Sequence, residues 1–93
     1  MKLNVESELI DYISKYILRI PSTDFNAKTM LLDKGLIDSF GIIELVLFIE
    51  KTFKLSLNEE DIHLENFSSV EAIHKMIIEK KWKLILLKNS QAL

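Results

Sequence analysis

The chain has no cysteine among its 93 residues, which excludes disulfide bonds and thiolate metal sites. No apolar run approaches the roughly 20 residues that cross a bilayer, so we expect no stable membrane insertion. The first residues turn acidic at Glu6 and do not resemble a signal peptide, so we expect a cytoplasmic protein. Clean alternation of apolar and polar residues is also lacking. That absence disfavours strands and predicts an all-α fold.

Basic residues are scarce in the middle of the chain. The formal net charge is −2, but residues 33–61 carry seven acids against three bases, a net charge of −4. Such a field attracts basic protein partners and repels the phosphates of nucleic acids. We therefore expect protein partners and no nucleic acid.

Apolar residues recur at helical spacing over most of the chain. They predict a first amphipathic helix over residues 3–18, which Pro21 ends. The loop that follows, up to Asp38, is rich in apolar side chains and is expected to pack on the core. A second helix is predicted over residues 39–53 and a small acidic third helix over residues 59–62.

The last helix has a recognisable start. Ser68 precedes Glu71 by three residues, which is the spacing of a capping box. The expected inward residues of this helix are Val70, Ile73, Met76 and Ile77. Together the elements predict a small four-helix up-down bundle with a long loop between the first and second helices.

A domain boundary is expected near residue 80. Residues 1–80 form the predicted domain, and residues 81–93 form a hydrophobic tail or an extension of the last helix. We expect Trp82, Leu84 and Ile85 to pack on the domain or to mediate self-association, rather than to bind a membrane. A monomer is the first expectation, with a dimer through the tail as the alternative.

The most informative segment is Gly35-Leu36-Ile37-Asp38-Ser39-Phe40-Gly41-Ile42-Ile43-Glu44-Leu45. It places Ser39 where a polar loop becomes a strongly apolar helix, with Asp38 or Ser39 as the helix cap. The helix dipole and the free backbone N–H groups favour a phosphate group at this position. No local base is present to activate the hydroxyl, so the serine suits the attachment of a covalent group better than catalysis.

This segment, with its continuation from Ile43 to Phe53, resembles the acyl carrier protein family, which includes peptidyl and D-alanyl carriers. The resemblance covers about residues 3–80 and implies that Ser39 carries a phosphopantetheine arm derived from coenzyme A. It also implies that Asp38 engages the metal ion of the phosphopantetheinyl transferase that loads the arm. The arm would then hold an acyl or aminoacyl group as a thioester, so the cofactor supplies the reactive group.

The resemblance further implies a recognition helix that docks on basic patches of acyl- or aminoacyl-loading and acyl-transfer enzymes. Its acidic positions match Glu44 and Glu50, and the apolar candidates are Phe40, Ile43 and Leu47. Core packing is the better interpretation of four other residues of this helix, which are Leu45, Val46, Ile49 and Phe53.

Several residues depart from the family pattern. Phe40 stands where leucine is usual, and Gly41 follows it, which could allow a partner or the arm to approach closely. Lys51 and Lys54 replace positions that are often acidic in fatty acid synthesis carriers. These departures favour a dedicated pathway, such as polyketide-like synthesis, amino acid activation or saccharide modification, and fatty acid biosynthesis is the alternative.

Two other functions stay open from the residues alone. The chain could be an unmodified carrier-like docking module in which Asp38-Ser39 is only a helix cap, or a helical dimerisation domain that uses residues 82–87. The sequence shows neither a Ser-His-Asp triad nor a paired-carboxylate arrangement, so we do not expect an enzyme. His63 and His74 lie on different predicted elements and are not expected to bind a metal.

Overall fold

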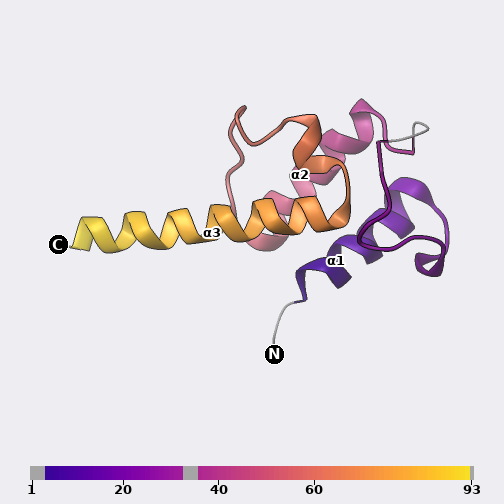
Figure 1. Ribbon diagram of the computed structural model, residues 1–93. Coiled ribbons are helices and arrows are strands. Elements are labelled where there is room, and N and C mark those ends of the chain that lie inside the picture. The colour runs from indigo at the N-terminus through magenta and orange to yellow at the C-terminus, as the bar shows by residue number, and fades with distance from the viewer. Residues whose placement is uncertain (1–3, 33–35, 93) are drawn as a thin grey trace.

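The computed structural model describes residues 4–32 and 36–92, and in this part of the chain the regular secondary structure is all helical, with no strand (Figure 1). The α-helices are α1 (Val5–Tyr12), α2 (Ser39–Phe53) and α3 (Val70–Ala92). A π-helical segment, η1 (Ile13–Leu18), and two short 3₁₀ helices, η2 (Ser22–Asp24) and η4 (Leu64–Phe67), complete the described elements. The predicted all-α class is confirmed.

The predicted four-helix bundle is not confirmed. Residues 59–61 form a turn instead of the expected third helix, and the short helix in this region is η4, a few residues later. Asn58 explains the difference, because its carbonyl accepts hydrogen bonds from the N–H groups of Asp61 and Ile62, which closes the chain into a turn. The long loop before α2 stays a prediction, since residues 33–35 lie outside the described residues.

The predicted helix over residues 3–18 changes character part-way. Asn4 caps α1 by accepting a hydrogen bond from the Ser7 N–H at 3.0 Å, and residue 3 lies outside the described part. Regular α-helix ends at Tyr12. Just beyond it, the buried Ser14 hydroxyl donates to the carbonyl of Asp11 at 3.0 Å. Such back-bonding competes with the helical ladder and accompanies bends and wider turns.

The core lies where α1, α2 and α3 meet the loop before α2. Its completely enclosed members come from every part of the chain, namely Leu9, Ile13, Leu31, Leu45, Ile49, Val70, Ile73 and Ile77. Backbone hydrogen bonds fasten the loop to the start of α3, because the Leu31 N–H donates to the Ser68 carbonyl at 2.8 Å and the Glu71 N–H donates to Ala27 at 2.9 Å. The prediction that the loop packs on the core holds for Phe25, Leu31 and Ile37, whereas Met30 and Leu36 are exposed.

The cap of α3 differs from the prediction by one residue. Ser69 Oγ accepts a hydrogen bond from the Ala72 N–H at 3.1 Å, so Ser69 is the cap and Ser68 is not. The Ser68 hydroxyl instead donates to the Glu65 carbonyl in η4. The expected capping box with Glu71 is therefore wrong. The four inward residues predicted for this helix are all buried.

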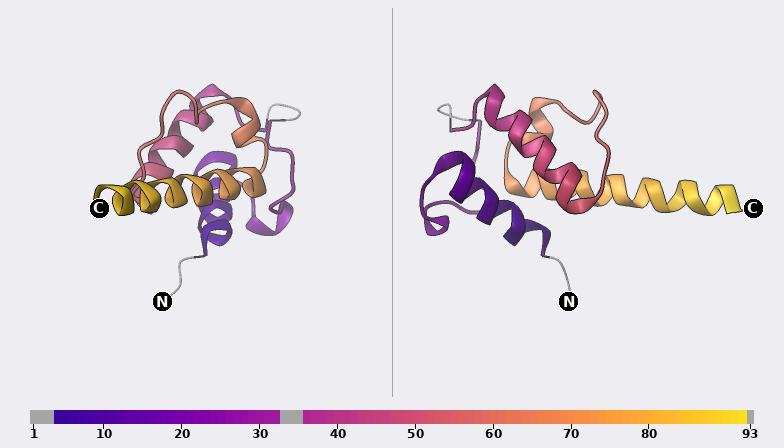
Figure 2. Two further views of the ribbon diagram at one scale, coloured as in Figure 1. Left: turned by 60° about the vertical axis from the view of Figure 1, so that its left-hand side comes forward. Right: turned by 180° about the vertical axis from the view of Figure 1, so that it is seen from behind.

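Helix α3 continues to Ala92 and projects beyond the body of the molecule (Figures 1 and 2). Trp82, Leu84 and Ile85 are all exposed, so the expectation that they pack on the domain is wrong. The domain boundary at residue 80 stays a prediction. Within the described ranges, no helix combines the length and apolar character needed to cross a membrane.

An ion pair ties the loop after α2 to α3. Lys80 Nζ lies 2.6 Å from Asp61 Oδ2, and the Asn58 N–H donates to the same oxygen at 2.8 Å. Burial raises the pKa of Asp61, but the hydrogen bonds from Lys80 and Asn58 outweigh this effect and leave the pKa below its ordinary value.

We predict that this carboxylate makes the protein acid-sensitive. A depressed pKa contributes stability that is complete above the unfolded value of about 3.9 and is lost as the pH falls through the folded value. In urea unfolding, Asp61→Asn should lower the free energy of unfolding by about 1 kcal/mol at pH 7. The stability of the Asp61→Asn variant should also fall less steeply than that of the wild type below about pH 4. Glu60, the exposed neighbour, provides the control, because Glu60→Gln should show the same dependence of stability on pH as the wild type. If the stability of Asp61→Asn ran parallel to that of the wild type over this pH range, Asp61 would not be the acid-sensitive group.

Candidate functional site

Asp38 caps α2 and sets the position of Ser39. Asp38 is in an extended conformation, and its Oδ1 accepts a hydrogen bond from the Gly41 N–H at 2.9 Å. The choice between two caps that the sequence left open is thereby settled in favour of Asp38. Ser39 is the first residue of the helix, and its side chain is exposed.

The first turn of α2 has backbone donors around Ser39 that the helix itself does not pair. The cap satisfies the N–H of Gly41, and the N–H of Ile42 donates to the Asp38 carbonyl at 3.0 Å. The N–H groups of Ser39 and Phe40 precede these and have no intrahelical acceptor. Together with the positive end of the helix dipole, they favour an anionic group attached to the Ser39 hydroxyl.

Gly41 is buried, and its missing side chain makes room for the chain's own residues. A Cβ atom at this position would lie 2.7 Å from Ile37 Cγ2 and 3.4 Å from Ile17 Cγ2. The expectation that Gly41 admits a partner or the arm is therefore corrected, since Ile37 and Ile17 occupy that space. The glycine instead lets the start of α2 pack tightly on the loop and on η1.

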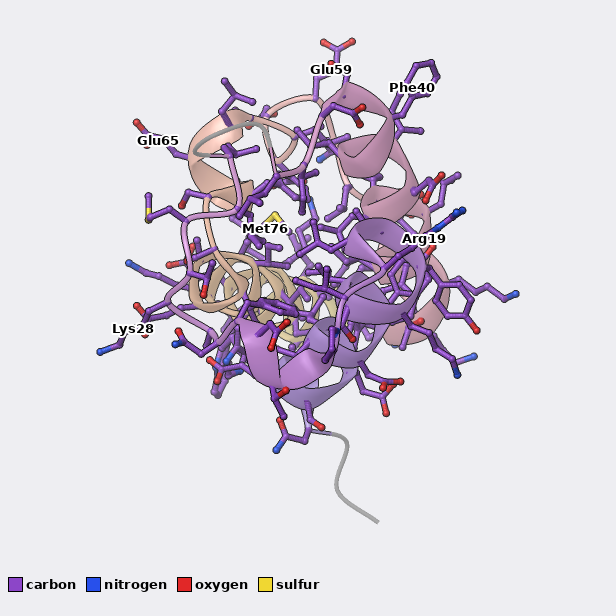
Figure 3. The ribbon with its side chains drawn as sticks, turned by 90° about the vertical axis from the view of Figure 1, so that its right-hand side faces the viewer. Arg19, Lys28, Phe40, Glu59, Glu65 and Met76 are labelled. Atoms are coloured by element: carbon purple, nitrogen blue, oxygen red, sulfur yellow. The ribbon has the colours of Figure 1, made fainter. Side chains whose placement is uncertain are left out.

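The face of α2 opposite Gly41 is apolar and open. Phe40, Ile43 and Leu47 are 77%, 58% and 60% exposed. At 3.6 residues per turn, they lie with Ser39 within an arc of about 100°. Figure 3 shows Phe40 pointing away from the body, whereas Met76 of α3 points inward. The predicted core residues Leu45, Ile49 and Phe53 are buried on the other side of the helix, and Val46 is half-buried.

The two acidic residues of the predicted docking surface have different environments. Glu44 is exposed and lies near Tyr12, whose pKa is raised by burial and, to a smaller extent, by this carboxylate. Glu50 is half-buried, and its Oε2 accepts a hydrogen bond from the Leu57 N–H at 2.9 Å. Glu50 thus has a structural role that the sequence did not indicate, because it anchors the loop after α2. Its role in docking stays a prediction.

A shallow pocket of about 250 Å³ lies beside the start of α2. Tyr16 and Arg19 line it together with Asp38 and Glu44, and Arg19 ends η1 with a left-handed φ of 56°. Sequence reasoning missed both Tyr16 and Arg19, because helical periodicity shows only that they end a helix. Their positions next to α2 depend on how the loop folds back.

The two histidines have different environments. His74 Nδ1 lies 2.9 Å from Glu6 Oε2 and connects α3 to α1, whereas His63 is exposed. Among the described residues, no group of three or more potential ligands is arranged to hold a metal ion.

Two curated proteins resemble the chain over most of its length. It is 33% identical to aminoacyl carrier protein 2 of Bradyrhizobium diazoefficiens over 79 residues, which are 84% of the chain and 88% of that protein. The chain belongs to the acyl carrier protein family. It is also 29% identical to PigG, a probable acyl carrier protein of a Serratia species, over 73 residues, 78% of the chain and 84% of that protein. No protein-family model matches the chain.

Membership of the acyl carrier protein family implies a phosphopantetheine prosthetic group in general and interaction with modifying and acyl-transfer enzymes. The residues at the start of α2 fit such a group. Ser39 supplies an exposed hydroxyl, and the N–H groups of the first helical turn beside it suit a phosphodiester. Carrier proteins are generally not catalytic.

We predict that Gly41→Ala destabilises the protein although alanine is the better helix former. Overpacking costs typically 1–3 kcal/mol and the gain in helix propensity is at most about 1 kcal/mol, so a net loss of about 1–2 kcal/mol is expected in chemical unfolding. The double variant Gly41→Ala/Ile37→Leu removes the Cγ2 methyl group that the new Cβ would contact. It should recover part of the loss in a double-mutant cycle. A Gly41→Ala variant as stable as the wild type would show that this contact does not constrain α2.

Proposed function

We propose that the chain is a carrier whose phosphopantetheine arm is attached to the Ser39 hydroxyl and holds an acyl or aminoacyl group as a thioester. The observation that carries this proposal is the exposed Ser39 at the first position of α2, directly after the Asp38 cap. The family supports a carrier role, and the structure makes this hydroxyl accessible.

In this proposal a separate phosphopantetheinyl transferase loads the arm, because a serine hydroxyl is a weak nucleophile until a base activates it. The transferase removes the hydroxyl proton, the oxygen of Ser39 forms the new bond to phosphorus, and the nucleotide portion of coenzyme A leaves. Once attached, the arm supplies a thiol that forms the thioester. The chain contributes an accessible oxygen and backbone donors that favour the phosphodiester.

Asp38 serves two purposes in this proposal. Its Oδ1 caps α2 through the Gly41 N–H, which keeps Ser39 at the start of the helix. The other oxygen of the carboxylate engages the metal ion of the transferase. The structural purpose needs only a hydrogen-bond acceptor, whereas the second purpose needs the negative charge.

The docking surface of the carrier consists of Phe40, Ile43, Glu44 and Leu47. Its three apolar members share one exposed face of α2 with Ser39, so an enzyme that covers them also faces the arm. Glu44 provides the charge that attracts a basic partner. Glu50 contributes less in this arrangement, because one of its oxygens is already bonded to the loop.

The lysines near this surface bear on the pathway in which the carrier works. Lys51 lies within α2 and Lys54 ends it, which makes the helix less negative than a recognition helix of fatty acid carriers. The relatives are named as an acyl and an aminoacyl carrier, and the proposal covers both kinds of cargo. A dedicated pathway with its own loading enzyme fits this charge pattern best.

Covalent loading is the first test. Incubation with coenzyme A, Mg²⁺ and a broad-specificity transferase should add one phosphopantetheine per chain, measured by intact-protein mass. Ser39→Ala should gain none, and Ser56→Ala, which removes another exposed hydroxyl, should be loaded as the wild type is. No addition with several transferases would refute the carrier role and favour an unmodified docking module.

The two purposes of Asp38 can be separated by substitution. Asparagine caps helices as well as aspartate does, so Asp38→Asn should change the free energy of unfolding by less than about 0.5 kcal/mol. Asp38→Ala should lose about 1 kcal/mol. Both variants should be loaded at least about tenfold more slowly, since both lack the charge that holds the metal ion. Normal loading of Asp38→Asn would restrict Asp38 to capping.

A further inference from the structure

The part of α3 beyond residue 80 exposes an unusual amount of apolar surface. Trp82, Leu86 and Leu87 are 60%, 60% and 58% exposed, and these residues lie on the part of the helix that projects from the body (Figure 2). A single helix of about 12 residues is marginally stable in water by itself. Clustered exposed apolar side chains on such a helix are typical of an interface.

One face of this helix carries a continuous apolar stripe. Ile78, Trp82 and Ile85 follow each other at intervals of four and three residues, which places them on the same face. Leu84 and Leu87 lie on another side, where they line a groove with Asn58 and Asp61 of the loop after α2. The chain's own loop therefore lies beside one side of the extension, and the stripe is the side available to a partner.

The surroundings of the stripe differ in charge from one end to the other. Residues 80–93 contain four lysines and no acid, whereas residues 1–79 contain fourteen acids and eight bases, a net charge of −6. At the body end, Ile78 lies in a shallow depression of about 390 Å³. Three acids (Glu6, Glu71 and Glu79) line it together with one lysine, Lys75, and with His74, so acids outnumber the lysine there. Basic extension and acidic body are thus complementary, and a second copy of the chain presents both.

We propose that two copies of this chain associate through their α3 extensions, antiparallel about a two-fold axis near Trp82. In this arrangement Ile85 of each copy enters the depression around the Ile78 of the other, and the two Trp82 side chains meet. An antiparallel pairing also places the two acidic bodies at opposite ends of the dimer, whereas a parallel pairing would bring their like charges together. This inference does not depend on the modification of Ser39.

The symmetry also pairs charges across the interface. Glu79 and Lys83 are four residues apart and lie on the same side of the stripe. Lys83 lies where this side meets the groove, because it also lines the groove beside the chain's own Asp61. A two-fold axis perpendicular to the helices brings the same sides of both helices together. Glu79 of one copy therefore lies against Lys83 of the other, and the contact occurs twice. The paired helices bury on the order of 1,000 Å², at the lower end for specific complexes, so the association is reversible.

The full-length chain provides the test, by sedimentation velocity between about 1 and 500 μM, a range that spans weak reversible interfaces. A concentration-dependent dimer should appear. The chain has one tryptophan, Trp82, so its emission should shift to shorter wavelength as the dimer forms. Ile85→Glu should keep the chain monomeric. Leu64→Glu, which also replaces an exposed aliphatic residue by glutamate but lies on η4, should dimerise as the wild type does. Ser39→Ala should also dimerise normally, which separates this result from the test of the carrier function.

A charge exchange tests the antiparallel geometry. Glu79→Lys should weaken the dimer about three- to tenfold, because two ion pairs become like-charge contacts. The double variant Glu79→Lys/Lys83→Glu restores opposite charges in this pairing and should recover the wild-type dissociation constant.

Three results would overturn the proposal. The first is a monomer throughout the concentration range. The second is an Ile85→Glu variant that still dimerises. The third concerns vesicles, under conditions in which the chain sediments as a monomer. If the emission of Trp82 shifts to shorter wavelength on vesicles that contain phosphatidylserine, but not on phosphatidylcholine vesicles, the stripe binds an anionic membrane surface instead.

Discussion

The close approach of Ile37 to Gly41 is the contact on which the geometry of the site depends. Only the absence of a side chain at Gly41 lets Ile37 Cγ2 lie 2.7 Å from the position that a Cβ would occupy. Because two residues correspond to about 200° around a helix, burying Gly41 turns Ser39 to the opposite side. The accessibility of the hydroxyl is therefore a consequence of packing on the far side of α2. The same contact places the Gly41 N–H within reach of Asp38, so cap and core fix the start of the helix together.

The apolar character of α2 is divided between two tasks by this orientation. Leu45 and Ile49 follow Gly41 at intervals of four residues and complete the core, where each is fully enclosed. The remaining large apolar side chains have no place inside and form the open face next to Ser39. A helix that is apolar on nearly all sides would be destabilising on a monomer's surface unless a partner covers it. The transient docking of enzymes that we propose gives such a face a reason to exist without permanent burial.

Periodicity was sufficient to predict α2, the buried face of α2 and the inward residues of α3, because these features depend on spacing alone. The features that were missed depend on competition between local hydrogen bonds. Either Ser68 or Ser69 could cap α3, and the choice of Ser69 follows from the bond between Ser68 and the Glu65 carbonyl. The turn at residues 59–61 and the π-helical segment after Tyr12 have the same origin in side-chain and backbone bonds. Arg19 and Tyr16 reach the candidate site only through the fold of the loop, which no spacing rule predicts.

Charge in this chain is separated along the sequence, and that separation assigns the two apolar surfaces to different partners. Phe40, Ile43 and Leu47 lie in the acidic part of the molecule, beside Glu44 and Asp38, and their surroundings attract a basic enzyme surface. Trp82 and Ile85 lie among lysines, and their surroundings attract an acidic surface such as the chain's own body. One surface would repel what the other binds, so in the proposed dimer a second copy held at α3 leaves the face beside Ser39 free for the enzymes of the proposed carrier function. Because these two surfaces discriminate by charge of opposite sign, association and carrier function can coexist on a chain of this size without competing for a partner.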